Sequence, residues 1–387
     1  MRRDPLIIGA GPAGSAAAIT LGRAGYRPAL VERTRGPTDK VCGDFLSLDA
    51  IQQARALGVD PSALGAAPIE RIRLIHGERT VEAALPFPAF GLSRRAFDAA
   101  LLRQAEGAGA VLHSGLTINH LTRESIAPPA RIGAPGISPG ISGETGQWRA
   151  QTGGQAGFAA DTVFLATGKH DLRDLPRPRT ERGAIGMKMY FALAPGAARM
   201  LDGAIELTLF PGGYAGMQAV EDGQTVLCIA VQKQAFQGYG AGWPGLIAAI
   251  ERHSHRFATM LDGARTLLPR PLAVAGIPYG YQVRPVSADG LFRLGDQAAV
   301  IPSLTGDGMA IALHTGRTAA EAWLNGDDSP TYHRSLARTL APQMRLAGLL
   351  HHACMSAPVQ AAVLRAAALF PVLLRHAASR TRLPSHP

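Results

Sequence analysis

Three glycines near the N-terminus have the spacing of a phosphate-binding turn. Gly9, Gly11 and Gly14 form the pattern G-x-G-x-x-G directly after a short apolar run. Glycines at these positions permit a tight turn, close approach of the backbone to a pyrophosphate, and close packing of a helix on a strand. Glu32, at the end of a second strand over 27–31, has the spacing of an acid that accepts from a ribose hydroxyl. This order of elements predicts a βαβ unit that binds the ADP part of a dinucleotide.

A second informative stretch lies far along the chain. Asp296 follows an apolar strand over 291–294, and Pro302, Gly306 and Gly308 precede the next helix. An aspartate at a strand end can hold a polyhydroxyl chain, while a helix N-terminus stabilises negative charge on an electron-rich ring. The two stretches together predict one extended cofactor site.

These residues resemble the flavoprotein superfamily that joins class A flavin monooxygenases, geranylgeranyl reductases and flavin-dependent halogenases. The resemblance runs from Gly9 to a helix ending near Trp323, and Arg94 matches an arginine that meets the FAD phosphates in such proteins. It implies non-covalent FAD, with NADPH or NADH as a transient electron donor, because no second dinucleotide unit is visible. The cofactor-binding residues expected are Gly9, Gly11, Pro12, Ala13, Gly14, Glu32, Arg33, Cys42, Gly43, Arg94, Thr167, Gly168, Gly295, Asp296, Pro302, Gly306, Gly308 and Met309.

The sequence departs from parts of this superfamily's pattern. Thr167-Gly168 stands where many hydroxylases have Asp-Gly, and the halogenase segment W-x-W-x-I-P is not found. The segment Val41-Cys-Gly-Asp44 instead resembles the C-G-G or C-G-E segment of the geranylgeranyl reductases. Phe210-Pro-Gly-Gly-Tyr-Ala-Gly216 resembles their substrate-sheet turn but lacks the aromatic W-x-F-P that follows it.

Three functions are compatible with these motifs. The leading expectation is an NAD(P)H-dependent monooxygenase acting on a lipophilic aromatic or polyketide-like molecule, because a sheet roof over the flavin can exclude water. The missing W-x-F-P segment adds weight to it. The alternative is a reductase of isoprenoid-like double bonds, favoured by the Cys42–Asp44 segment. A non-catalytic flavin-binding partner protein is the third interpretation, suggested by Thr167-Gly168.

The sequence identifies no catalytic acid or base. Cys42, His314 and Tyr214 are weak candidates, and each is as compatible with ordinary packing. His170 is a candidate of the same kind. Tyr190, Phe210, Met217 and Tyr281 could line a cavity, but alternation along strands favours core positions for most of them. Neighbouring histidines at 253/255 and 351/352 face different sides of their helices, so no metal site is expected.

The motifs lie on an α/β architecture. We expect a glutathione-reductase-type, Rossmann-like FAD-binding domain from residues 1–70, 94–175 and 285–325. An antiparallel substrate sheet from 71–93 and 180–284 is inserted into it, and 331–387 forms a C-terminal helical segment.

The local patterns predict the individual elements. Helices are expected at 47–57, 94–106, 245–257, 307–323 and 331–378, and a hairpin at 69–75 and 80–85 around Gly77. One strand is expected at 111–121 and one at 161–168, and 186–232 alternates as an antiparallel sheet. The Gly-, Pro- and Ser-rich stretch 126–146 reads as a surface excursion, and 258–285 as irregular chain.

The composition argues against several classes of protein. The chain has 387 residues, 47% of them hydrophobic and 18% charged, with a formal charge of +10. Its arginines are scattered, which argues against nucleic acid as a partner. Three cysteines, a strand at the N-terminus and no apolar run of about 18 residues favour a cytoplasmic protein without a transmembrane segment. The C-terminal helices favour packing on the FAD domain, with peripheral lipid contact as the alternative. The substrate is expected to be small and lipophilic; the oligomeric state stays open.

Overall fold

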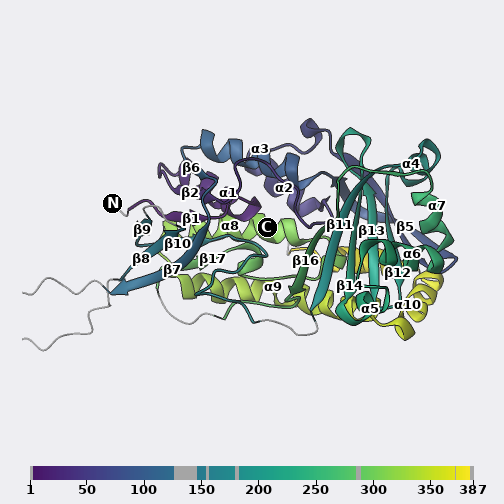
Figure 1. Cartoon of the computed structure of the whole chain (residues 1–387). Helices are drawn as coiled ribbons and strands as arrows, with labels where there is room; N and C mark the ends of the chain where they lie inside the picture. The colour runs from purple at the N-terminus through teal and green to yellow at the C-terminus, as the bar shows by residue number, and fades with distance from the viewer. Residues whose placement is uncertain are drawn as a thin grey trace, which may run out of the picture.

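The computed structural model describes residues 3–125, 146–153, 157–178, 183–284, 289–370 and 372–383. Figure 1 shows two sheets side by side, with a long C-terminal helix running along both. The fold is an α/β FAD-binding fold with a parallel sheet, a curled mixed sheet and C-terminal helices. The predicted class is therefore confirmed.

The first sheet is parallel throughout and carries the glycine turn. Its strand order is β17-β10-β1-β2-β6. Helices α1, α3 and α8 pack together on one face of this sheet. Because the strands are parallel, their carboxyl ends lie at one edge, where doubly wound folds bind ligands. The bounds are β1 Leu6–Ile8, β2 Ala29–Glu32, β6 Val111–Ser114, β10 Val163–Leu165, β17 Leu291–Arg293, α1 Pro12–Arg23, α3 Arg94–Gly107 and α8 Gly308–Asn325.

A small antiparallel sheet covers the opposite face. It consists of β7 (Ile118–Ser125), β8 (Gly146–Thr152) and β9 (Phe158–Ala160), and its side chains share a core with β1 and β10. The single strand predicted over 111–121 is wrong, because β6 and β7 belong to different sheets and Gly115 turns the chain between them with φ +75°. All but the last residue of the excursion predicted over 126–146 lies outside the described residues.

The second sheet has nine strands and is mixed. Its order is β15-β11-β14-β13-β12-β4-β5-β3, with β16 also on β11. The prediction of a wholly antiparallel sheet is wrong at one position, because β4 and β12 pair in parallel. No hairpin constrains that pair, since the chain passes through the FAD-binding sheet between them. The bounds are β3 Phe45–Leu46, β4 Ala67–His76, β5 Arg79–Gly91, β11 Ala184–Ala192, β12 Ala204–Phe210, β13 Gly213–Ala219, β14 Thr225–Gln232, β15 Arg265–Thr266 and β16 Leu272–Ile277.

Short helices join and cover these strands. The helix predicted at 245–257 is two helices, because Ser254 ends α6 and caps α7 by accepting from the backbone of Phe257. The chain predicted to be irregular before 285 contains β15 and β16. The helical bounds are α2 Leu48–Ala56, α4 Pro195–Leu201, α5 Lys233–Gly238, α6 Trp243–His253 and α7 His255–Leu261, with 3-10 turns η1 Ser62–Leu64, η2 Glu221–Gly223, η3 Gly295–Gln297 and η4 Ser303–Thr305. The domain boundaries stay a prediction.

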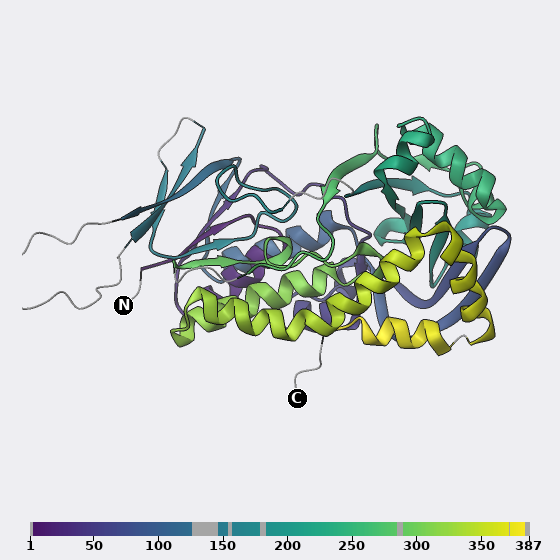
Figure 2. The ribbon, with the colours of Figure 1, turned by 90° about the horizontal axis from the view of Figure 1, so that it is seen from below.

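Three helices end the chain. α9 (Ser329–Met355) packs on α8 and β17 and reaches the second sheet, where α10 (Ala357–Leu369) and α11 (Val372–Arg380) pack on β4 and β5. Figure 2 shows this course from below. α10 and α11 thus cover the second sheet rather than the FAD-binding sheet. None of the described helices is long and apolar enough to cross a membrane by itself, and only α10 and α11 together, bent by 110°, meet that test of length and composition.

Candidate functional site

The glycine turn is shaped by close backbone contacts. A Cβ atom on Gly14 would lie 1.8 Å from the carbonyl oxygen of Gly9, and one on Gly9 would lie 2.4 Å from that of Ala166. Gly9 also has a φ of +102°, which favours glycine. Gly11 differs, because a Cβ there would meet only the Arg94 guanidinium, at 3.5 Å. Gly9 and Gly14 therefore let strand and helix approach, while Gly11 leaves open space above the turn.

The N-terminus of α1 is suited to an anion. Its N-cap residue Gly11 has no side chain to cap the helix, Pro12 follows, and the first turn carries no acidic residue. Arg94 lies beside it, held by two 2.7 Å hydrogen bonds to the Asp98 carboxylate. Free backbone N–H groups, the helix dipole and a fixed guanidinium together suit a pyrophosphate.

Glu32 is fixed next to the same turn. Its carboxylate accepts from the backbone of Ala10 at 3.0 Å and from the backbone and hydroxyl of Thr34 at 3.1 and 2.9 Å. Burial raises the pKa of Glu32, but these hydrogen bonds outweigh it and the net shift is downward. A carboxylate kept ionised here can accept from ribose hydroxyls. Nearby, Arg33 contacts the ring of His170 at 2.7 Å, so that histidine pairs with a cation at the surface.

Asp296 lies against the glycine turn from the other end of the chain. A Cβ on Gly295 would be 3.2 Å from the Cβ of Ala13, and the backbone N–H of Gly295 donates to Thr315 at 2.8 Å. The Asp296 carboxylate pairs with Lys169 at 3.3 Å. The fold thus brings the two predicted motifs together, nearly 300 positions apart in the sequence.

Lys169 lies in the candidate site, although the sequence did not single it out. Asp296 is the main cause of its raised pKa, and its charge also interacts with Arg94, Cys42 and Tyr279. It is thus a cation among residues expected to contact FAD. The sequence did contain a signal for Lys169. It is one of only four lysines in an arginine-rich chain, and it directly follows Thr167-Gly168.

The N-terminus of helix α8 is the second uncapped helix end in the candidate site. Pro302 and η4 lead to Gly306, whose φ of +68° and contact with the Phe45 ring (2.7 Å from an added Cβ) both demand glycine. The Asp307 side chain makes no capping bond to α8, and no atom lies within 4 Å of where a Cβ on Gly308 would stand. Met309 is buried behind them. The first N–H groups of α8 are thereby left for a ligand.

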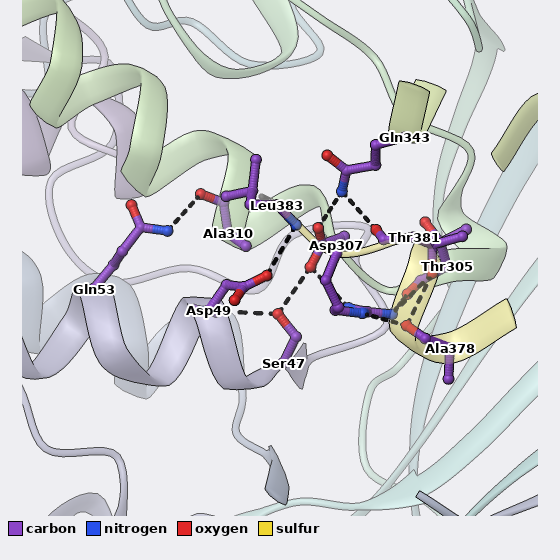
Figure 3. A network of polar contacts seen from close by, with 12 residues as sticks. Ser47, Asp49, Gln53, Thr305, Asp307, Ala310, Gln343, Ala378, Thr381 and Leu383 are labelled. Atoms are coloured by element: carbon purple, nitrogen blue, oxygen red, sulfur yellow. Dashed lines mark hydrogen bonds and ion pairs between the residues drawn. The ribbon is translucent and has the colours of Figure 1, made fainter. Parts of the chain in front are cut away.

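A buried network holds this loop from behind (Figure 3). Asp307 is fully buried and accepts from Ser47 Oγ at 2.8 Å, from Arg382 Nη1 at 2.7 Å and from the Gln343 amide. Arg382 also donates to the Thr305 carbonyl at 2.5 Å. Burial raises the pKa of Asp307 and the Arg382 charge opposes that shift. No local sequence signal predicts that a residue of the C-terminal segment fixes this loop.

Removing this arginine is expected to loosen the loop. Arg382→Gln leaves a buried carboxylate without its cation, which costs about 3–5 kcal/mol of unfolding free energy. We expect a lower urea midpoint and FAD binding weakened at least tenfold, measured by fluorescence titration. Arg380→Gln, at the exposed end of α11, is the matched control. Equal stability and FAD affinity in the two variants would contradict this role.

On the second sheet, a buried ion pair anchors the Cys42–Asp44 segment. Lys188 and Asp44 are both fully buried, with 2.6 Å between Nζ and Oδ2, and Tyr190 donates to the same oxygen at 2.5 Å. Lys188 also donates to the Lys40 carbonyl at 3.1 Å, and Gln218 to the Asp44 carbonyl at 3.0 Å. Strands β11 and β13 thereby hold the segment that follows β2.

Two tyrosines meet at the loop that precedes α8. The hydroxyls of Tyr214 and Tyr279 each lie 2.8 Å from Ser303 Oγ, and the His351 ring packs edge-on against both. Burial raises the pKa of Tyr279 to about 12 and that of Tyr214 well above its usual value. Both hydroxyls therefore keep their protons at neutral pH. Tyr214 was a predicted candidate, whereas Tyr279 was missed.

The other catalytic candidates lie in different surroundings. Cys42 is half-buried and its sulfur accepts weakly from the Asp44 backbone at 3.5 Å. His314 is buried within α8, and Tyr190, Phe210 and Met217 are core residues. Tyr281 is half-buried. Among the residues that the structure describes, no group of three or more His, Cys, Asp or Glu could hold a metal ion. The catalytic roles stay predictions.

Several known proteins are similar to this chain in sequence or in fold. A family model described as the FAD binding domain matches residues 2–123. The menaquinone reductase of Mycolicibacterium smegmatis is 26% identical over 336 residues, which span 84% of this chain and 77% of that protein. The digeranylgeranylglycerophospholipid reductase 2 of Methanopyrus kandleri is 24% identical over 332 residues, spanning 83% and 76%. The flavin-dependent brominase Bmp2 superposes with a TM-score of 0.74 at 18% identity, covering 98% of this chain and 93% of that one, a likeness of fold.

The residues present fit FAD. One uncapped helix N-terminus with Arg94 suits the pyrophosphate, Glu32 a ribose, and Asp296 the ribityl chain. The open N-terminus of α8 suits the electron-rich end of the ring. When bound, FAD supplies hydride and electron transfer at this edge, and the protein supplies orientation and protons.

Proposed function

We propose that this FAD-dependent oxidoreductase reduces a carbon–carbon double bond in a lipophilic, isoprenoid-like substrate, with NADPH or NADH as electron donor. The observation that carries the proposal is the hydroxyl pair Tyr279 and Tyr214 on Ser303, at the loop expected to hold the flavin ring. Such a reduction needs a proton donor beside the hydride donor.

The similar proteins support the same choice. Two relatives that match over four-fifths of this chain are named as reductases of a quinone and of an isoprenoid lipid. The Cys42–Asp44 segment, which resembles that of geranylgeranyl reductases, is held at the site by the Lys188–Asp44 pair. These features favour reduction over the hydroxylation that the motifs alone led us to expect.

The protein's part in the reaction is to deliver a proton. Adding hydride to one carbon of a double bond leaves the other carbon to take a proton, so that two electrons and two hydrogens are gained. Tyr279, half-buried at Ser303, donates from its hydroxyl. Ser303, which is exposed and hydrogen-bonded to Tyr279, then passes a proton from water back to that tyrosine, while Tyr214 holds the Ser303 hydroxyl in place.

An anaerobic assay tests this proposal. The protein is mixed with NADPH or NADH and polyprenyl quinones or geranylgeranyl lipids, and product mass is measured. A gain of two hydrogens without oxygen is expected. Labelled oxygen in the product would instead establish a monooxygenase, and failure of both donors to bleach the flavin would favour a non-catalytic flavin-binding protein.

The role of Tyr279 as the proton donor is tested separately. Tyr279→Phe is expected to lower turnover about a hundredfold, the usual contribution of a general acid, while FAD content and flavin bleaching stay unchanged. Tyr281→Phe, two residues further along, is the control. Full turnover by Tyr279→Phe would exclude it as the proton donor.

A further inference from the structure

Four large apolar side chains are exposed where α10 meets α11. Leu369 is 74% exposed, Phe370 59%, Val372 50% and Leu373 48%. We call these four residues the apolar corner. Figure 2 shows the two helices bending at the outer end of the second sheet, away from the FAD-binding sheet. Exposed side chains of this size gathered at one point indicate an interaction surface.

The C-terminal segment that carries the apolar corner has charged side chains of one sign. From residue 329 to the end of the sequence there are seven arginines and no aspartate or glutamate. Arg365 on α10 and Arg375 on α11 are both exposed and flank the corner. Neither forms an ion pair within the described part of the chain. Their charge is therefore available to an anionic partner.

A groove adjoins the corner. It has a volume of about 500 Å³ and lies between α10 and the start of β5. Arg79 and Arg365 supply two guanidinium groups, and Val81, Leu364 and Leu369 supply an apolar wall. Leu369 belongs to both the corner and the groove, and Arg365, which flanks the corner, also lines the groove. A phosphate beside an acyl chain has the matching chemistry.

We propose that the apolar corner docks on an anionic lipid bilayer. The corner enters the interfacial region, and Arg79, Arg365 and Arg375 contact lipid phosphates, as in other interfacial helices. A second copy of this chain fits less well, since a self-complementary contact would bring two surfaces of the same positive charge together. Docking would also bring α11, which leads to Arg382, next to a source of lipophilic substrate.

Vesicle co-sedimentation of the FAD-loaded protein tests this surface. We expect binding to vesicles of phosphatidylcholine with phosphatidylglycerol, weaker binding to phosphatidylcholine alone, and a decline as salt is raised. The double variant Phe370→Ser, Leu373→Ser should bind anionic vesicles at least tenfold more weakly. Arg365→Glu with Arg375→Glu should abolish the preference for anionic vesicles.

Matched controls lie elsewhere on the surface. Met200→Ser removes an exposed apolar side chain on α4, and Arg103→Glu reverses an exposed charge on α3. Both should bind as the original protein does, with FAD content confirming that every variant is folded. No vesicle binding by the original protein would overturn the proposal. Vesicle binding by the corner variants equal to that of the original protein would also overturn it. So would corner variants that lose a dimer in analytical sedimentation while their vesicle binding stays unchanged.

Discussion

Replacing Gly11 with aspartate is expected to yield a folded protein that no longer retains FAD. Gly11 has φ −72° and ψ −173°, which any residue adopts, and a Cβ there contacts only Arg94 at 3.5 Å. A new carboxylate would thus fit the protein but stand at the N-terminus of α1. It would pair with the Arg94 guanidinium and repel the pyrophosphate from both of its donors.

The expected loss is at least a hundredfold in FAD affinity, about 2.8 kcal/mol. Absorbance of the purified protein and titration with FAD measure it, and circular dichroism checks the fold. Gly11→Ala, which adds a methyl group without charge, should lose much less. Retention of FAD by Gly11→Asp at the original affinity would show that the pyrophosphate lies elsewhere.

The sequence located those parts of the candidate site whose signal is local. The glycine turn, Glu32 and the Gly295-Asp296 pair each combine a strand end with a residue type that the backbone geometry demands. The N-caps Ser47 and Ser93 likewise marked the helices α2 and α3, because a side-chain oxygen beside a free N–H acts within a few residues. Such features need no knowledge of the rest of the chain.

The features that the sequence did not predict depend on contacts between residues far apart in the chain. Lys188 alternates with apolar neighbours on β11 and reads as one more strand residue, although its partner Asp44 lies 144 positions away. The parallel pairing of β4 with β12 is similarly hidden, because turn residues specify hairpins but not the pairing of strands from separate segments. Arg382 stands in a basic tail whose composition indicates surface, yet it is paired with a buried carboxylate.

The Lys188–Asp44 pair gives the second large effect. Lys188→Met leaves the Asp44 carboxylate buried without its cation, and we expect a loss of about 3–5 kcal/mol in unfolding free energy. Asp44→Asn should destabilise comparably by leaving the ammonium of Lys188 unpaired. Asparagine suits this position, since residue 44 has a φ of +56° and asparagine tolerates the left-handed region. Urea unfolding measures each variant.

The double variant Lys188→Met, Asp44→Asn decides what the pair does. Each single change leaves one buried charge, whereas the double change leaves none. The double variant should therefore lose much less unfolding free energy than the sum of the two single losses. Strictly additive losses would contradict a direct pairing. A buried ion pair is often no more stable than an apolar replacement, so its retention calls for another reason. If stability recovers while substrate turnover does not, the pair serves to hold the segment Cys42–Asp44 against the flavin edge, with Tyr190 and Gln218 completing the anchor.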